Sequence, residues 1–139
     1  MSLDHFGELN WLAVAVAAVA YFALGGLWFA RPVFGRAWAA AAGVEMPEGR
    51  TPAYFYWGPF VAVAVSTVAT GLLACATQSD TFAEAVLLGL VLAVGFAADI
   101  SALSGLFDQR PRRGAWFAIF TGYHAVGLMI ASIIVSLWR

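Results

Sequence analysis

Long apolar runs separated by short polar connections make up most of this chain. Four runs are long enough to cross a membrane as helices: residues 11–30, 54–77, 82–107 and 115–138. A helix needs about 20 mostly apolar residues to cross about 30 Å of hydrocarbon. The pattern therefore predicts an all-α fold, an integral membrane bundle of four transmembrane helices that forms a single domain over residues 1–139.

The connections indicate where these helices begin and end. Asn10 is a favourable N-cap residue for the first span, and Arg31-Pro32 makes further helix unfavourable. Thr81 and Glu84 have the spacing of a capping box at the start of the third span. Residues 33–42 mix aromatic, basic and small side chains over too short a distance to cross. We expect a short interfacial helix there, lying in the headgroup region.

Composition points to lipid as the solvent of this chain. Hydrophobic residues make up 63% of the sequence and charged residues 11%, which is too few for the polar surface of a soluble protein. The formal net charge of -1 argues against a nucleic-acid partner, because no basic surface is available to neutralise phosphates. The single cysteine, Cys75, cannot form an internal disulfide.

Basic residues gather in the first and third connections and predict the orientation. The side chains expected to anchor this membrane border are Trp28, Arg31, Arg36, Trp38, Arg110, Arg112 and Arg113, and Arg50 lies in the same loop as Arg36. The basic groups expected on the opposite side are Arg139 and the amino terminus. Because Arg-rich loops stay cytoplasmic, we expect a bacterial inner-membrane protein with both termini outside.

Two ionisable side chains, Asp99 and His124, lie well inside apolar spans. If the third and fourth spans are antiparallel helices joined near Arg110, residue 99 lies level with about residue 122, within about one helical turn of His124. One hypothesis is a proton-exchanging pair in a site bounded by Ser101, Ser104 and Tyr123. The alternative is a fixed hydrogen-bonded pair that specifies how the two helices pack.

Small residues recur every four positions along the second span, at Ala62, Ser66, Thr70 and Ala74. Residues at this spacing share one helix face, and small side chains allow helix backbones to approach closely. We interpret this face as a helix-packing seam, with a polar permeation path as the alternative. Gly89 and Gly95 are expected to mark close helix contacts on the third span.

A short internal similarity links the two halves of the chain. Residues 26–32 align without gaps on residues 105–111, and an Ala-Trp pair follows each copy. If the similarity is a true repeat, the protein consists of two similar hairpins of the same orientation. The alternative is chance similarity between two basic membrane borders.

Several segments resemble a known family. Residues 10–14, the Gly-Leu-Trp-Phe of 26–29 and the segment 32–38 are similar to the opening of the bacterial membrane family catalogued as domain of unknown function 1761, and Gly-Tyr-His at 122–124 with Leu-Trp at 137–138 resembles its ending. The resemblance covers essentially the whole chain and implies a small four-helix membrane protein. It implies no activity. Phe29 departs from the pattern, because a tyrosine is expected there.

Two functional classes follow. The first is a structural or accessory membrane protein that acts as a homo-oligomer or with a membrane-protein partner. The second is a minimal oligomeric transporter or channel that uses the Asp99 and His124 pair. No nucleophile, metal cluster or phosphate loop suggests an enzyme, and we expect no cofactor and no metal. His124 with Met129 or another subunit is the one arrangement that could ligate haem.

Overall fold

A computed structural model describes residues 4–46, 49 and 51–138, so the predictions for Arg50 and Arg139 lie outside the described residues. In this part of the chain every regular element is helical. The elements are α1 (His5–Glu8), α2 (Trp11–Trp28), the π-helical η1 (Arg31–Gly35), α3 (Arg36–Ala42), α4 (Tyr54–Thr77), α5 (Phe82–Leu92), the π-helical η2 (Ala93–Ala98), α6 (Asp99–Phe107) and α7 (Arg113–Leu137).

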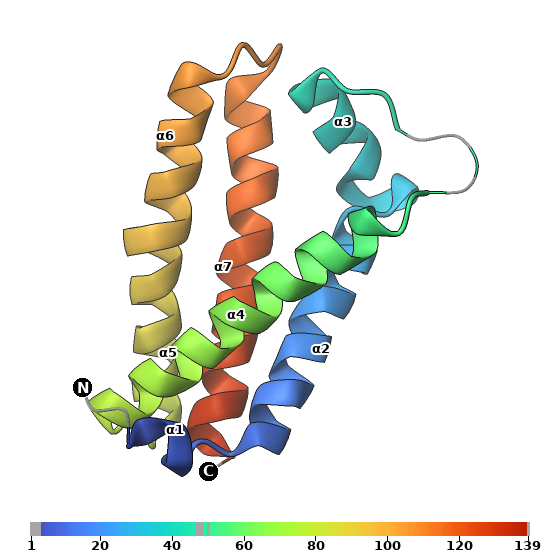
Figure 1. The fold of residues 1–139 in the computed structure, drawn as a ribbon. Helices are drawn as coiled ribbons and strands as arrows, with labels where there is room; N and C mark the ends of the chain where they lie inside the picture. Colours follow the sequence, from blue (N-terminus) through green and yellow to red (C-terminus); the bar gives the residue numbers. More distant parts are fainter. Residues whose placement is uncertain (1–3, 47–48, 50, 139) are drawn as a thin grey trace.

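Four helical segments are long and apolar enough to cross a membrane, as the sequence pattern predicts. They are α2, α4, the continuous span α5–η2–α6, and α7. Successive spans run in opposite directions, so the two hairpins point the same way and both chain ends lie at the opposite end (Figure 1). The all-α, four-span fold class is thus confirmed. The first span ends at Trp28, slightly before residue 30, because Phe29 and Ala30 turn the backbone ahead of Pro32.

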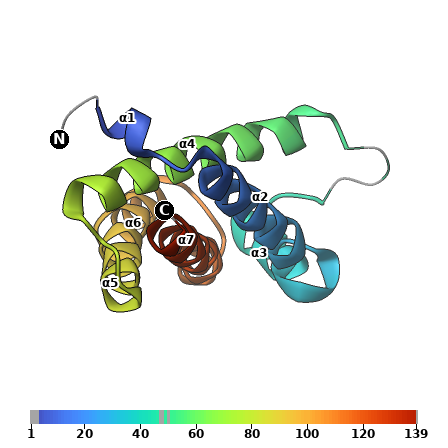
Figure 2. The same cartoon turned by 90° about the horizontal axis from the view of Figure 1, so that it is seen from below.

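The last helix, α7, is the centre of the bundle. It packs against α5 on one side and α2 on the other, and α4 crosses over it (Figure 2). The buried residues of α7 include Tyr123, Leu128, Ala131 and Val135, which belong to the same hydrophobic cluster as Tyr21 of α2. Every other span therefore takes its position from α7.

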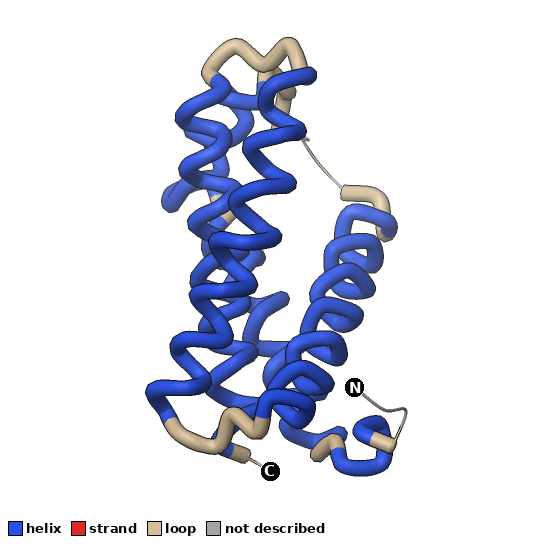
Figure 3. The backbone as a smooth tube through the Cα atoms, turned by 90° about the vertical axis from the view of Figure 1, so that its left-hand side faces the viewer, coloured by secondary structure: helices blue, strands red, loops and turns tan. Residues whose placement is uncertain are grey.

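Helix α4 is tilted relative to the other three spans. In Figure 1 it crosses the face of the bundle obliquely, and in the side view it leans away from the other spans at the end where it begins (Figure 3). Burial follows this tilt: residues 54–59 are all exposed, whereas Thr70, Gly71, Leu72 and Ala74 are buried. One half of α4 therefore packs on the bundle, and the other half diverges from it.

The expected short helix is present as α3, and it packs against α7 (Figure 1). Its Ala39 and Ala41 are buried, and the backbone N–H of Arg112 donates to the carbonyl of Ala41 at 3.2 Å. The small alanine side chains allow this close approach. The alanine run, whose face the sequence left unassigned, is thus a packing surface for the start of α7.

Side-chain caps begin two spans where the sequence predicts them. The Asn10 carboxamide oxygen accepts from the backbone N–H groups of Leu12 and Ala13 at 3.1 and 3.2 Å. At α5 the Glu84 N–H donates to the Thr81 hydroxyl at 3.3 Å, and the Thr81 N–H donates to a Glu84 carboxylate oxygen at 2.9 Å. This capping box satisfies N–H groups that have no partner within the helix.

Thr81→Ala should therefore lower the free energy of unfolding by about 1 kcal/mol, the usual cost of losing an N-cap hydroxyl. Denaturant unfolding in detergent, followed by circular dichroism, measures the change. Glu84→Gln is the matched control, because glutamine retains an acceptor for the Thr81 N–H and should leave stability nearly unchanged. Equal unfolding curves for Thr81→Ala and the unsubstituted chain would show that the box does not contribute.

Candidate functional site

Asp99 and His124 do not meet. Asp99 is the first residue of α6 and its side chain is exposed on the outside of the bundle. His124 is half-buried inside it, and its Nδ1 lies 2.6 Å from the hydroxyl of Tyr21 on α2. The predicted pair is therefore wrong, both as a proton-exchanging site and as a fixed packing contact.

The direction of Asp99 follows from a stripe of small residues that faces the bundle. The stripe recurs every four positions along the third span, at Ala85, Gly89, Ala93, Ala97, Ser101 and Gly105, all of them buried or half-buried. Asp99 is two residues from both Ala97 and Ser101, which places it on the opposite face of the helix. The π-helical η2 takes more than 3.6 residues per turn, so the four-residue spacing stays on one side. This stripe was the sequence signal that could have placed Asp99 outside.

The partner of His124 is Tyr21, which is 1% exposed. The Tyr21 ring also lies 5.3 Å from the ring of Tyr123, and the Phe120 ring lies 4.6 Å from the imidazole in an edge-on arrangement. Sequence reasoning missed Tyr21, because a tyrosine in an apolar span carries no signal of its own and its partner lies 103 positions away.

This hydrogen bond also decides where the imidazole carries its proton. A buried phenol donates its hydrogen, and the described residues offer the Tyr21 hydroxyl no acceptor other than His124 Nδ1. Tyr21 therefore donates to Nδ1, and neutral His124 carries its own proton on Nε2. Among the described residues Nε2 has no hydrogen-bond partner, and the atom is not completely buried.

A cavity of about 530 Å³ lies beside the pair, between α4, α7 and the third span. Tyr21, Ser66, Thr70, Ser101 and His124 contribute its polar atoms. Three of the four hydroxyls already have a hydrogen bond: Tyr21 with His124 Nδ1 at 2.6 Å, Thr70 with the Ser66 carbonyl at 2.8 Å and Ser101 with the Ala97 carbonyl at 2.6 Å. His124 and Ser66 are thus the side chains whose donors are left for a ligand.

The predicted seam on α4 is only partly a packing surface. Thr70 and Ala74 are buried, whereas Ser66 is half-buried on the cavity and Ala62 is exposed. The reason is the tilt of α4, which separates its first half from the bundle. On the third span Gly89 does mark a close contact, with Met129 of α7, but a Cβ added at Gly95 would meet nothing within 4 Å.

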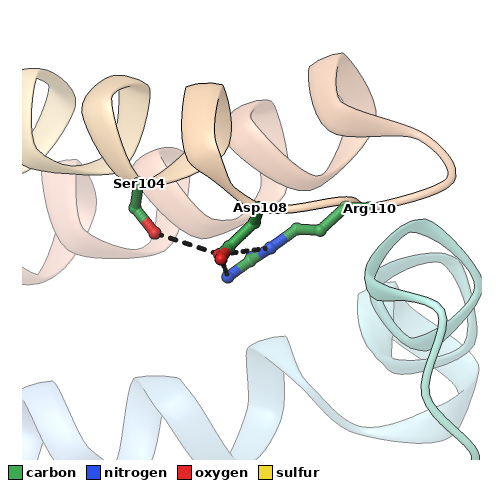
Figure 4. A network of polar contacts seen from close by, with 3 residues as sticks. All are labelled: Ser104, Asp108 and Arg110. Atoms are coloured by element: carbon green, nitrogen blue, oxygen red, sulfur yellow. Dashed lines mark hydrogen bonds and ion pairs between the residues drawn. The ribbon is translucent and has the colours of Figure 1, made fainter.

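The other predicted site residues lie in separate places. Ser104 donates to the Asp108 carboxylate at 3.3 Å, and Arg110 donates to the same oxygen from Nε at 3.0 Å and from Nη2 at 2.5 Å (Figure 4). These bonds join the last turn of α6 to the connection that follows it. Tyr123 is buried with its ring 5.2 Å from that of Phe29. Only Ser101 and His124 of the predicted set line the same cavity.

The expected membrane anchors divide into two groups. Arg31, Arg36, Arg112 and Arg113 are exposed at one end of the bundle, while Arg110 is half-buried with its guanidinium 3.4 Å from the centre of the Trp116 ring. Trp28 and Trp38 point into the protein. The Trp28 indole N–H donates to the Ile119 carbonyl at 3.0 Å, and the Trp38 ring packs edge-on against Phe29. Both tryptophans therefore make contacts within the protein, and their role as membrane anchors stays a prediction.

In the part of the chain that the structure describes, no three His, Cys, Asp or Glu side chains are grouped closely enough to hold a metal ion. Met129, the second haem ligand considered from the sequence, packs on Gly89 in the contact between α5 and α7.

Comparison with known proteins relates the chain to one family. Neither the curated proteins nor the solved structures gave a match. The sequence model of the family described as "Protein of unknown function (DUF1761)" matches residues 12–136, which include all four spans almost entirely. A match of this extent shows membership, so this multi-pass, four-helix chain belongs to the DUF1761 family.

Proposed function

We propose that the chain is a non-catalytic accessory protein of the membrane that works as a homo-oligomer, with the Asp99 face of the third span as its contact surface. The observation that carries this proposal is the exposed carboxyl of Asp99. It lies eight residues before the end of the span at Phe107 (107 − 99), about 12 Å along the helix axis.

An exposed aspartate at this depth is unstable in lipid. Insertion scales assign Asp at the centre of a spanning helix a cost of about 2.5 to 3.5 kcal/mol, and such residues normally face protein or water. The described part of this chain supplies no partner for Asp99: the arginines lie at the ends of the spans, and His124 is bonded to Tyr21. The covering group must therefore come from another molecule.

A second copy fits the surroundings of Asp99. Gly95 and Ala102 are exposed on the same side of the helix, and their small side chains allow another helix to approach closely. No spanning segment has a lysine or arginine at this depth, and His124 is bonded to Tyr21, so a symmetric contact brings two Asp99 carboxyls together. Two carboxylic acid groups can form a pair of hydrogen bonds with each other, which gives each a polar partner inside the hydrocarbon.

The test is the oligomeric state of Asp99 variants in lipid nanodiscs or mild detergent, measured by light scattering. The unsubstituted chain and Asp99→Asn should associate, because both side chains can hydrogen-bond to their own copy, whereas Asp99→Leu should be monomeric with an intact fold. Ser101→Ala, on the opposite face of the same helix, is the control and should not change association. An unsubstituted chain that stays monomeric, or an Asp99→Leu chain that still associates, would overturn the proposal.

The alternative function, a minimal transporter that works through Asp99 and His124, loses its geometric basis because Asp99 points away from α7. For location we propose the cytoplasmic membrane of a bacterium, with the Arg-rich loops in the cytoplasm and both termini outside. The arginines of the two connections support this orientation: Arg31 and Arg36 follow α2, and Arg112 and Arg113 lie at the start of α7.

A further inference from the structure

We propose that the cavity beside Tyr21 and His124 binds a neutral lipophilic molecule whose carbonyl oxygen accepts a hydrogen bond from His124 Nε2. This site is separate from the Asp99 face, because Asp99, Gly95 and Ala102 are not among the residues that line it. The inference therefore holds or fails independently of the proposed oligomer.

His124 lines the cavity and has one ring nitrogen without a partner among the described residues. Tyr21 occupies Nδ1, so the proton of neutral His124 lies on Nε2, which has no partner among the described residues. Because the Tyr21 ring is 1% exposed and packs on α7 at Gly127, the hydroxyl that orients the imidazole cannot easily move. A ligand with an acceptor atom would complete the hydrogen bonding of the ring. In other proteins a hydrogen bond to one ring nitrogen of a histidine likewise orients the other nitrogen toward a ligand or metal.

The remaining lining selects against charge. Its larger side chains are apolar or aromatic, among them Leu92, Phe96, Phe120 and Leu128, and none of the described lining residues carries a permanent charge. An ionised substrate would find no counter-ion here and would have to lose its hydration. The volume of about 530 Å³ is within the range of sites for small organic ligands. The class that fits is a neutral ring compound with one polar carbonyl end.

The ligand reaches this cavity from the bilayer. Ala69 of α4 and Phe96 and Ile100 of the third span line the cavity and are also exposed on the surface of the bundle. A molecule dissolved in the membrane can therefore enter sideways, without passing through the polar loops.

The experiment compares two ligands that differ in a single carbonyl, 9-fluorenone and fluorene, on chain labelled with ¹⁵N-histidine in nanodiscs. The chain has two histidines, so His5 on α1 is an internal reference for His124. We expect fluorenone to shift the Nε2 resonance of His124 saturably and to bind about tenfold more tightly than fluorene, the difference of about one hydrogen bond. The His5 resonances should not move.

Three variants complete the test by equilibrium dialysis. His124→Phe retains a ring without a donor and should bind both ligands equally weakly. Ala69→Leu fills the cavity from an exposed position and should abolish the binding of both ligands. His5→Phe should change the affinity for neither ligand. Equal affinity of fluorenone and fluorene for the unsubstituted chain, as for a void that accepts any acyl chain, would overturn the proposal. So would the absence of saturable binding, or unchanged binding in Ala69→Leu. If His124→Phe does not fold, the ligand pair and Ala69→Leu decide.

Discussion

Gly127→Ala is expected to lower the free energy of unfolding by about 3 kcal/mol, at the upper end of the usual cost of overpacking a core. A Cβ at position 127 would overlap the ring of Tyr21, with Cε2, Cδ2 and Cζ as the nearest atoms. The ring is 1% exposed and bonded to His124, so it has no free direction in which to move. Either α2 separates from α7 or the hydrogen bond to His124 breaks.

Denaturant unfolding in detergent measures the loss, and Gly26→Ala is the matched control. Gly26 lies on α2 with nothing within 4 Å of an added Cβ, so alanine there should not destabilise the fold. A double-mutant cycle identifies the cause: if the clash with the ring is responsible, Gly127→Ala should cost much less in a Tyr21→Ala background. Equal costs in both backgrounds would show that the close contact between α2 and α7 does not depend on this glycine.

Gly89→Val should open the contact between α5 and α7 and destabilise the chain by about 3 kcal/mol, again as overpacking. An added Cβ would lie 3.0 Å from the Cα and Sδ of Met129 and 3.4 Å from the hydroxyl of Ser132. The thioether can swing away, but the Met129 Cα is backbone in the middle of α7 and cannot. Branching at Cβ adds two further methyl groups to the same space.

The control is Gly26→Val, the same change on α2. Nothing lies within 4 Å of a Cβ at position 26, and valine has a higher helix propensity than glycine, so no loss of stability is expected. Thermal unfolding in detergent, followed by circular dichroism, compares the two variants. Equal melting temperatures for the two valine variants would contradict a tight α5–α7 contact at Gly89.

The candidate site was only half accessible to sequence reasoning. His124 was correctly singled out as a polar group inside a span, and Ser101 was correctly placed near it. Asp99 was chosen for its depth, and depth says nothing about rotation about the helix axis. The small-residue stripe through Ala97 and Ser101 carries the information about that rotation, because it marks the face that packs on the bundle.

The sequence by itself determined the number of spans, their approximate limits and their caps. These properties are local. The length of an apolar run decides whether a helix can cross the hydrocarbon, and the side chains of Asn10 and Thr81 bond to N–H groups within three residues. Only the tertiary structure decided that Tyr21 orients His124 and that a cavity lies beside them. The physical reason is that both depend on how far α4 tilts and how closely α2 approaches Gly127, and such distances arise from packing between segments far apart in the chain.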